Sequence, residues 1–205
     1  MITGKIILFG GTFDPIHLGH TAVASFAAEA IGAEKVIFIP AKRSPLKNLL
    51  PKACDSDRFA MAELAIVGNG KFELSDCELK KSTHSYTLDT VREFKKAYDK
   101  DAEICWLIGA DSVSELPYWY RIAELIDECN LCVMYRAGYG KPDFNGFVGM
   151  WGQGRVDKLQ RNIIQTPLIN TSSTEVRKRL ASGEDVSEML HQEVIEYINR
   201  RGLYQ

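Results

Sequence analysis

The sequence predicts an α/β fold, a doubly wound parallel sheet with helices on both faces, in a single domain. Two observations predict this fold class. Short apolar runs that suit buried strands alternate with longer segments of helical pattern, which is typical of βαβ units and a parallel sheet. The chain has 205 residues, of which 45% are hydrophobic, and this is enough for one continuous core. Right-handed crossovers would bring the carboxyl ends of the strands to one edge of the sheet.

The individual elements follow in order from the apolar pattern. The runs predicted as strands are 5–9, 35–39, 71–74, 103–108, 131–135 and 163–169. The segments predicted as helices are 18–31, 56–67, 87–98, 118–128, 173–181 and 188–200, and the helices within 173–200 are expected to pack on the domain. Two stretches are predicted to be irregular. The first, 41–52, has four basic residues and two prolines and should be an exposed loop; the second, 137–155, has six glycines and should be a long excursion.

Composition excludes several function classes. A net charge of -2 and a pI of about 6.1 argue against nucleic acid as a partner. The chain has no apolar stretch near the roughly eighteen residues of a membrane span, and its amino terminus lacks a signal-peptide pattern, so we expect a cytoplasmic protein with no membrane partner.

The five cysteines are odd in number and unevenly spaced, which is not a disulfide framework. Cys129 and Cys132 form the one close pair. A zinc site would need a second pair or nearby histidines, and neither is evident. Both are therefore predicted to be buried structural thiols, and no metal-ligating residues are predicted.

The most informative segment follows the first predicted strand and reads Gly10-Gly11-Thr12-Phe13-Asp14-Pro15-Ile16-His17-Leu18-Gly19-His20. Such a strand-to-helix junction presents backbone N–H groups and the positive end of a helix dipole, so it favours a bound anion, most often phosphate. His17 and His20 are three residues apart and share one face of the first helical turn. We expect two cationic donors aimed at a phosphate chain; the alternative is a glycine-rich turn with two surface histidines.

A second segment follows the last predicted strand and reads Thr171-Ser172-Ser173-Thr174-Glu175-Val176-Arg177. Ser172 and Glu175 match the S-x-x-E capping box, so the plain interpretation is a well-capped helix start. Arg177 adds a guanidinium beside free N–H donors, which favours a second anion site. We therefore expect two helix starts from distant parts of the chain to converge on one triphosphate. The sequence has neither a G-x-x-x-x-G-K-[ST] loop nor a G-x-G-x-x-G after a strand, so Walker-type ATP binding and an ordinary dinucleotide site are unsupported.

The first segment resembles the T-x-G-H signature of the nucleotidylyltransferase superfamily, in the longer form typical of the bacterial nicotinate mononucleotide adenylyltransferases. The run at 172–177 resembles the second signature of that superfamily. Further resemblances cover nearly the whole chain in the right order: Phe38-Ile39-Pro40 with Pro45-Leu46-Lys47, Ser85-Tyr86-Thr87-Leu88-Asp89-Thr90, Ile108-Gly109-Ala110-Asp111, Leu116-Pro117-Tyr118-Trp119-Tyr120, and the ending with Tyr197-Ile198 and Gly202-Leu203-Tyr204. In two departures, Ser44 and Leu46 stand where the family usually has Pro and His.

The resemblance implies a Rossmann-like fold and an enzyme of NAD biosynthesis. In the implied reaction, the 5′-phosphate of nicotinate mononucleotide attacks the α-phosphorus of ATP, and nicotinate adenine dinucleotide and pyrophosphate form. The implied partners are ATP and nicotinate mononucleotide, with Mg²⁺ on the triphosphate. A homo-oligomer is compatible with the sequence.

The same resemblance implies roles for individual residues. His17 and His20 would contact the α and β phosphates, while Lys47 and Arg177 would contact the leaving pyrophosphate. The residues implied to line the ATP cleft are Gly10, Gly11, Thr12, Phe13, Ser172, Ser173 and Thr174. On the pyridine side, the implied residues are Trp119, which would stack on the nicotinate ring, Thr87 and Tyr120, whose neighbouring backbone N–H groups would receive its carboxylate, and Asp111, which would orient substrate hydroxyls or the Mg²⁺ shell.

Two other functions stay open at this point. One is a sister nucleotidylyltransferase that uses nicotinamide mononucleotide, phosphopantetheine or a CTP-dependent substrate; the S-Y-T and W-Y elements argue against it. The other is a non-catalytic nucleotide-binding domain. The intact His17, His20, Lys47 and Arg177 weigh against that alternative, because a binding module could lose charges that are needed only in the transition state.

Overall fold

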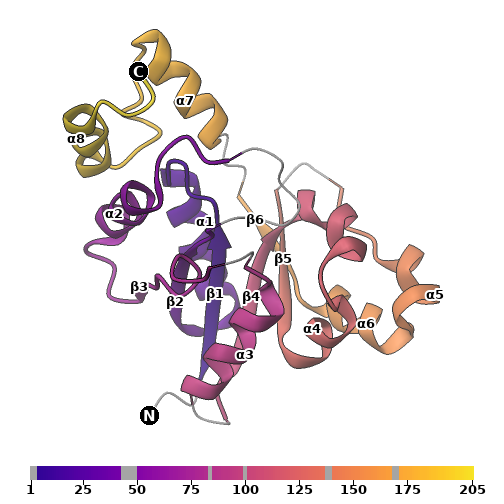
Figure 1. Ribbon diagram of the computed structural model, residues 1–205. Helices are drawn as coiled ribbons and strands as arrows, with labels where there is room; N and C mark the ends of the chain where they lie inside the picture. The colour runs from indigo at the N-terminus through magenta and orange to yellow at the C-terminus, as the bar shows by residue number, and fades with distance from the viewer. Residues whose placement is uncertain (1–3, 43–49, 83–84, 99–100, 137–139, 168–170) are drawn as a thin grey trace.

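The computed structural model describes residues 4–42, 50–82, 85–98, 101–136, 140–167 and 171–205 (Figure 1). Within these ranges six parallel strands form one sheet in the order β3-β2-β1-β4-β5-β6. The strands are β1 (Lys5–Gly11), β2 (Ala33–Pro40), β3 (Phe72–Leu74), β4 (Glu103–Gly109), β5 (Asn130–Arg136) and β6 (Ile163–Thr166). The chain runs outward from β1 to β3 and then returns to β4 beside β1. In such sheets ligands bind at the carboxyl ends of the strands where the winding reverses, which here is between β1 and β4.

Helices connect the strands and close the chain. They are α1 (Leu18–Ile31), α2 (Asp55–Ile66), α3 (Thr87–Ala97), the 3₁₀ helix η1 (Ala110–Tyr118), α4 (Ile122–Glu128), the 3₁₀ helix η2 (Asn145–Phe147), α5 (Val148–Trp151), α6 (Gln153–Arg161), α7 (Ser173–Ser182) and α8 (Gln192–Arg201). Figure 1 shows α7 and α8 together with the C-terminus at the end of the molecule toward which β1 points. The last two helices therefore lie at the edge of the sheet where the strands end.

The sheet separates two hydrophobic cores. Ile7 and Phe9 of β1 belong to the first core, and Ile6 and Leu8 belong to the second, as the two-residue period of a strand requires. Buried residues of α1, α2 and α8 complete the first core, and those of α3, α4 and α6 complete the second. Because both faces of the sheet are covered, its strands read in the sequence as near-continuous apolar runs.

The helix predicted at 118–128 is wrong at its start. In the structure η1 runs to Tyr118 and α4 begins at Ile122. Arg121 lies between them in the left-handed region, with φ of 51°. An α-helix of L-residues does not continue through that conformation, so the apolar spacing that suggested one helix is divided between two elements.

The irregular excursion predicted at 137–155 is wrong from residue 145 onward, whereas the described residues 140–144 have no helix or strand. Residues 145–161 form η2, α5 and α6. Phe144, Trp151 and Val156 from this region are buried in the second core. Gly152 separates α5 from α6 with φ of 80°, a left-handed conformation that glycine adopts easily. The high glycine content therefore predicted a loop, whereas the segment is helical because its apolar side chains pack into the core.

The two close cysteines are buried, as predicted: Cys129 is 4% exposed and Cys132 is 1% exposed. Burial raises the pKa of the Cys129 thiol to about 12, so this thiol stays protonated and unreactive near neutral pH. No helix in the described ranges is long and apolar enough to span a bilayer.

Candidate active site

The junction after β1 is a tightly packed turn that leads into α1 at Leu18. Within it, Phe13 has φ of 48°, which is an uncommon conformation for a bulky residue. Its side chain is buried, at 2% exposure, and packs edge-on against the rings of Phe9 and His20 at centroid distances of 5.6 and 5.1 Å. A strained residue held this firmly by its surroundings is typical of functional turns.

Aromatic packing explains the two glycines that open the turn. A Cβ atom at Gly10 would lie 2.5 Å from the Trp106 ring, and a Cβ atom at Gly11 would lie 2.7 Å from the Phe13 ring. Both distances are far below van der Waals contact. The glycines therefore let the rings of Trp106 and Phe13 close directly against the backbone at the end of β1.

We expect Gly10→Ala to lower the free energy of unfolding by about 1–3 kcal/mol, because the added methyl group must displace the packed Trp106 ring. Urea denaturation of the purified variant would measure this loss. Gly70→Ala is the matched control, since a Cβ atom there would meet nothing within 4 Å. Equal stability of the two variants would contradict the packing argument.

The two histidines of the turn are held against each other. Their rings stack with a centroid distance of 3.7 Å and an interplanar angle of 27°. His17 is 6% exposed and His20 is half-buried. The backbone N–H of His17 donates a hydrogen bond to Nδ1 of His20 at 3.1 Å. Because this Nδ1 is an acceptor, the proton of the His20 ring is on Nε2, and Nε2–H is the group that can donate to a ligand.

The second predicted segment meets this turn. Ser173 donates a hydrogen bond from Oγ to the carbonyl oxygen of Pro15 at 2.9 Å. Nη1 of Arg177 donates to the carbonyl oxygen of Asp14 at 2.7 Å, and Nη2 donates to Oγ1 of Thr174 at 3.3 Å. The start of α7 is thus in direct contact with the residues that precede α1, although some 160 positions separate them in the sequence.

The capping function predicted for Ser172 is also present. Its Oγ accepts a hydrogen bond from the backbone N–H of Glu175 at 3.2 Å, as an N-cap residue does. The Ser172 hydroxyl keeps its proton available as a donor. In contrast, the Ser173 hydroxyl already donates to Pro15, so in this state it supports the turn and offers no proton to a phosphate.

Arg58 of α2 also supports the turn, and the sequence did not predict it. Its side chain is 0% exposed. Nη1 donates to the carbonyl oxygen of Thr12 at 2.6 Å, and Nη2 donates to Oδ1 of Asp55 at 2.7 Å. In the sequence only the (i, i+3) spacing of Asp55 and Arg58 is visible, and that spacing is common on exposed helices.

Three carbonyl oxygens of the turn therefore point to side chains of α2 or α7: those of Thr12, Asp14 and Pro15. In a trans peptide the N–H group points away from the C=O group. The amides of the Thr12–Phe13 and Pro15–Ile16 peptide units are consequently turned away from these helices. When the carbonyls of a turn face neighbouring helices and its N–H groups face the opposite way, those N–H groups can bind an anion.

The residues predicted for the pyridine side lie at the start of α3 and in or just after η1, the helices that precede and follow β4. Thr87 is the first residue of α3, and the ring of the preceding Tyr86 lies 4.5 Å from that of Tyr120. Trp119 follows η1 and is half-buried against the second core. Among the described atoms no hydrogen-bond partner meets its buried Nε1. Asp111 is exposed, in the first turn of η1.

A buried carboxylate holds the start of α3 in place. Glu78 is 3% exposed and accepts a hydrogen bond from Oγ1 of Thr90 at 2.8 Å. Nζ of Lys81 donates to the same Oγ1 at 2.9 Å. Burial is the largest influence on Glu78 and raises the pKa of its carboxyl group. These contacts fix the first turns of α3, which begins at Thr87.

Two sequence predictions cannot be placed directly. Lys47 lies outside the described residues. For Mg²⁺, the described residues contain no group of three His, Cys, Asp or Glu side chains that could hold a metal ion.

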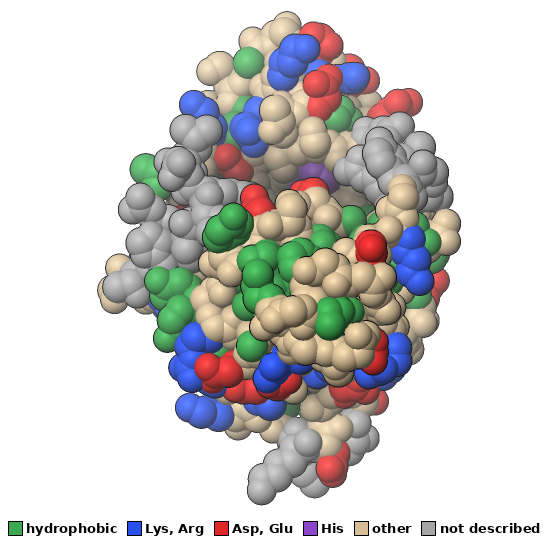
Figure 2. All heavy atoms as spheres, turned by 90° about the vertical axis from the view of Figure 1, so that its right-hand side faces the viewer, with side chains coloured by type: hydrophobic (Ala, Val, Ile, Leu, Met, Phe, Trp, Pro, Cys, Tyr) green, Lys and Arg blue, Asp and Glu red, His purple; other side chains and the backbone are tan. Residues whose placement is uncertain are grey.

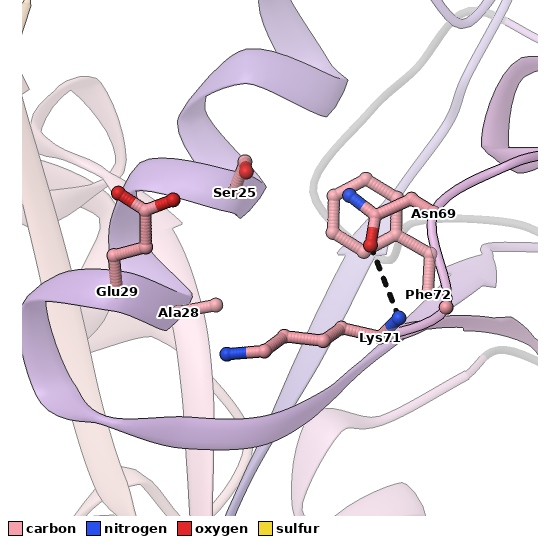
Figure 3. A pocket seen from close by; sticks show the side chains of 7 residues that line it. Ser25, Ala28, Glu29, Asn69, Lys71 and Phe72 are labelled. Atoms are coloured by element: carbon pink, nitrogen blue, oxygen red, sulfur yellow. Dashed lines mark hydrogen bonds between the residues drawn. The ribbon is translucent and has the colours of Figure 1, made fainter.

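The surface of the molecule is recessed beside α7 and α8. In Figure 2 a recess separates the C-terminal helices from the body of the molecule, and a histidine side chain is visible in it. A different hollow, of about 290 Å³, lies between α1 and the turn before β3 and is lined in part by Ser25, Glu29 and Lys71 (Figure 3). It contains none of the predicted site residues and lies near the amino end of β3, away from the turn at 12–17.

Comparison with known proteins identifies the family of the chain. Residues 8–179 match the family described as cytidylyltransferase-like. A Pectobacterium atrosepticum protein named "Probable nicotinate-nucleotide adenylyltransferase" is 35% identical, over 96% of this chain and 97% of its own. A protein of the same name from Neisseria meningitidis serogroup C is 38% identical, over 98% of each.

Solved structures confirm the predicted fold class. Plasmodium falciparum nicotinic acid mononucleotide adenylyltransferase, complexed with NaAD, superposes with a TM-score of 0.74 at 20% identity, covering 98% of this chain and 97% of the other. The same protein complexed with APC gives a TM-score of 0.72 at 19% identity, covering 98% and 96%. At these identities the likeness is one of fold.

Proposed function

Since the chain belongs to the nicotinate-nucleotide adenylyltransferase family, we propose that it transfers the adenylyl group of ATP to nicotinate mononucleotide. The products are nicotinate adenine dinucleotide and pyrophosphate, in NAD biosynthesis. The observation that carries this proposal is the contact between the two phosphate-binding segments, in which Ser173 and Arg177 of α7 hydrogen-bond to Pro15 and Asp14 of the turn.

In the proposed reaction an oxygen of the mononucleotide phosphate forms a bond to the α-phosphorus of ATP. The bond from that phosphorus to the α,β-bridging oxygen breaks, and pyrophosphate leaves. The nucleophile is already an ionised phosphate, so no general base is required. The protein can then accelerate the reaction by holding two anions in line and by stabilising the charge that develops on the bridging oxygen and on pyrophosphate.

The side chains suit that task. His20 offers Nε2–H, and the stacked ring of His17 lies beside it, so we assign both to the α and β phosphates. Arg177 is assigned to the leaving pyrophosphate, as is Lys47 by resemblance. The Ser172 hydroxyl can donate to a phosphate oxygen, whereas Ser173 stabilises the turn.

A Mg²⁺ ion would reach the site mainly on the triphosphate. Mg²⁺ is typically bound through substrate phosphates, waters and one or two carboxylates. The described residues fit this mode, because they provide the exposed carboxylate of Asp111 at the end of β4 and no larger metal-binding cluster. When bound, the ion would neutralise phosphate charge.

We propose that the enzyme works in the cytoplasm. The five cysteines are free thiols, three of them buried, which suits a reducing compartment.

The start of α3 favours an acid over an amide as the pyridine substrate. The first N–H groups of a helix have no intrahelical acceptor, and the dipole there favours negative charge. The backbone N–H of Thr87 is such a group. An amide would turn its NH₂ group toward these donors and leave them unpaired.

We therefore expect kcat/KM for nicotinate mononucleotide to exceed that for nicotinamide mononucleotide by about 10²-fold or more. Steady-state kinetics with both mononucleotides at saturating ATP would measure the ratio. Equal efficiency would contradict the acid-specific assignment.

Pyrophosphate release from ATP tests the function itself. With nicotinate mononucleotide as acceptor we expect rapid release, and with phosphopantetheine we expect none. Release with another acceptor alone would indicate a sister nucleotidylyltransferase. ATP binding without release in the presence of any acceptor would indicate a non-catalytic nucleotide-binding domain.

A further inference from the structure

The carboxylate of Asp14 lies buried at the centre of the phosphate-binding turn, with the residue 5% exposed. Donors from separate parts of the chain surround it. Oδ2 accepts from the backbone N–H of Lys52 at 2.8 Å, and Oδ1 accepts from the backbone N–H of Ala53 at 3.0 Å. The Tyr204 hydroxyl donates to Oδ1 at 2.7 Å, and Nη1 of Arg177 lies 3.9 Å from Oδ2.

A buried anion beside a triphosphate site needs this full set of donors. A buried carboxylate without partners is strongly destabilised, and its charge would also repel the phosphates. The hydrogen-bond donors stabilise the buried charge of Asp14, and the guanidinium of Arg177 offsets its repulsion of the phosphates. The donors also fix the position of the residue from which the backbone continues to His17 and His20.

The donor supplied by Tyr204 comes from the extreme end of the chain. After α8 the backbone reverses at Gly202, and Leu203 N–H donates to the carbonyl oxygen of Ile198 at 3.1 Å. Tyr204 itself has φ of 65°, a conformation that is unfavourable for a side chain of this size. The fold therefore holds Tyr204 in a costly conformation in which its hydroxyl reaches Asp14. Burial and the neighbouring carboxylate raise the pKa of this phenol far above its ordinary value, so it remains a donor.

A second tyrosine of the same segment makes a chemically equivalent contact elsewhere. The Tyr197 hydroxyl donates to Oδ1 of Asp57 at 2.8 Å, and Asp57 is 4% exposed. Nε of Arg201 donates to the same oxygen at 3.1 Å. This pair joins α8 to α2 and does not touch the turn. Tyr197 therefore attaches the C-terminal segment to α2, whereas Tyr204 supports the turn.

We infer that Tyr204 is a positioning residue for adenylyl transfer: its hydroxyl holds the Asp14 carboxylate and thereby the turn that carries His17 and His20. The inference rests on the proposed function. It implies that the phosphate-binding turn is complete only when the C-terminal residues are in place.

The test compares Tyr204→Phe with Tyr197→Phe in the full-length chain. Each substitution removes one phenol hydroxyl from one buried carboxylate. We expect Tyr204→Phe to lower kcat by about 10-fold, in the range typical for loss of a residue that orients a reacting group. We expect Tyr197→Phe to keep kcat within about twofold of the wild type while lowering Tm by as much as Tyr204→Phe does.

Hydrogen–deuterium exchange gives a second readout that does not depend on activity. The amides of Lys52 and Ala53 should exchange faster in Tyr204→Phe than in Tyr197→Phe, because only the former weakens the carboxylate to which they donate. If the wild type releases no pyrophosphate with any acceptor, the proposed function fails, and this comparison still decides whether Tyr204 holds the turn.

The inference is overturned if Tyr204→Phe has the kcat of the wild type, or if both variants lose kcat equally. Equal exchange of the two amides in both variants also overturns it. Failure of Tyr204→Phe to fold at 25 °C, with Tyr197→Phe folded, would make Tyr204 a stability residue and overturn it as well.

Discussion

Replacing His20 with alanine should slow turnover by about 10²-fold or more, the scale expected when a preorganised donor to the transition state is lost. The structure explains why His20 is the donor to remove. Its Nδ1 accepts from the backbone N–H of His17, so the ring proton that alanine would remove is on Nε2. Pyrophosphate release at saturating ATP and nicotinate mononucleotide would measure the loss in kcat.

Two further variants at this position separate donation by Nε2–H from the hydrogen bond that Nδ1 accepts from His17. Asparagine places an acceptor near the position of Nδ1 but has no donor at Nε2, while glutamine places a donor near Nε2. We expect His20→Asn to be as slow as His20→Ala and His20→Gln to recover part of the rate. His191→Ala is the control, because His191 is the N-cap residue of α8 and its Nε2 lies 3.1 Å from Oγ1 of Thr21. Near-normal kcat in His20→Ala would refute the assignment.

Replacing Arg177 with alanine should lower kcat/KM for ATP by about 10²-fold or more. One nitrogen of this guanidinium already holds the Asp14 carbonyl oxygen, so the planar fork is fixed next to the turn before ATP binds. Arg177→Lys should recover little of the activity, because one ammonium group cannot reproduce a fork that holds the turn and, in the proposed role, also contacts a phosphate. Steady-state kinetics with varied ATP would measure both variants.

Arg179→Ala is the matched control on the same helix. Arg179 lies two residues along α7 and donates from Nε to Oε1 of Glu175 at 3.1 Å, with a side-chain exposure of 41%. Exposed pairs of this kind contribute about 0–1 kcal/mol, so the control should keep its kcat/KM. If Arg177→Ala and Arg179→Ala lose equal activity, the guanidinium of Arg177 has no special role in the reaction.

The expected convergence of two distant segments depended on short motifs and on the rule that parallel strands end at one edge. The structure brings Ser173 and Arg177 into contact with the turn at 14–15. The roles of these residues toward ATP stay predictions, as do those of Trp119 and Asp111. The mistaken assignments arose where local pattern was ambiguous. Arg121 interrupts a helical pattern because its φ is positive, which the identity of the residue does not predict. In the glycine-rich stretch, Trp151 packs into the second core and stabilises the helical conformation.

The sequence by itself determined the order of the six strands and of most helices, and the position of both segments that we propose to bind phosphate, because strand and helix periods, caps and glycine turns act over a few neighbouring residues. Only the tertiary structure decided what holds the turn. Arg58 reaches Thr12 across 46 positions, and Tyr204 reaches Asp14 across 190. Hydrogen bonds between residues so far apart leave no periodicity or spacing in the sequence, since they form only after the sheet has brought α2, α7 and α8 to the same edge.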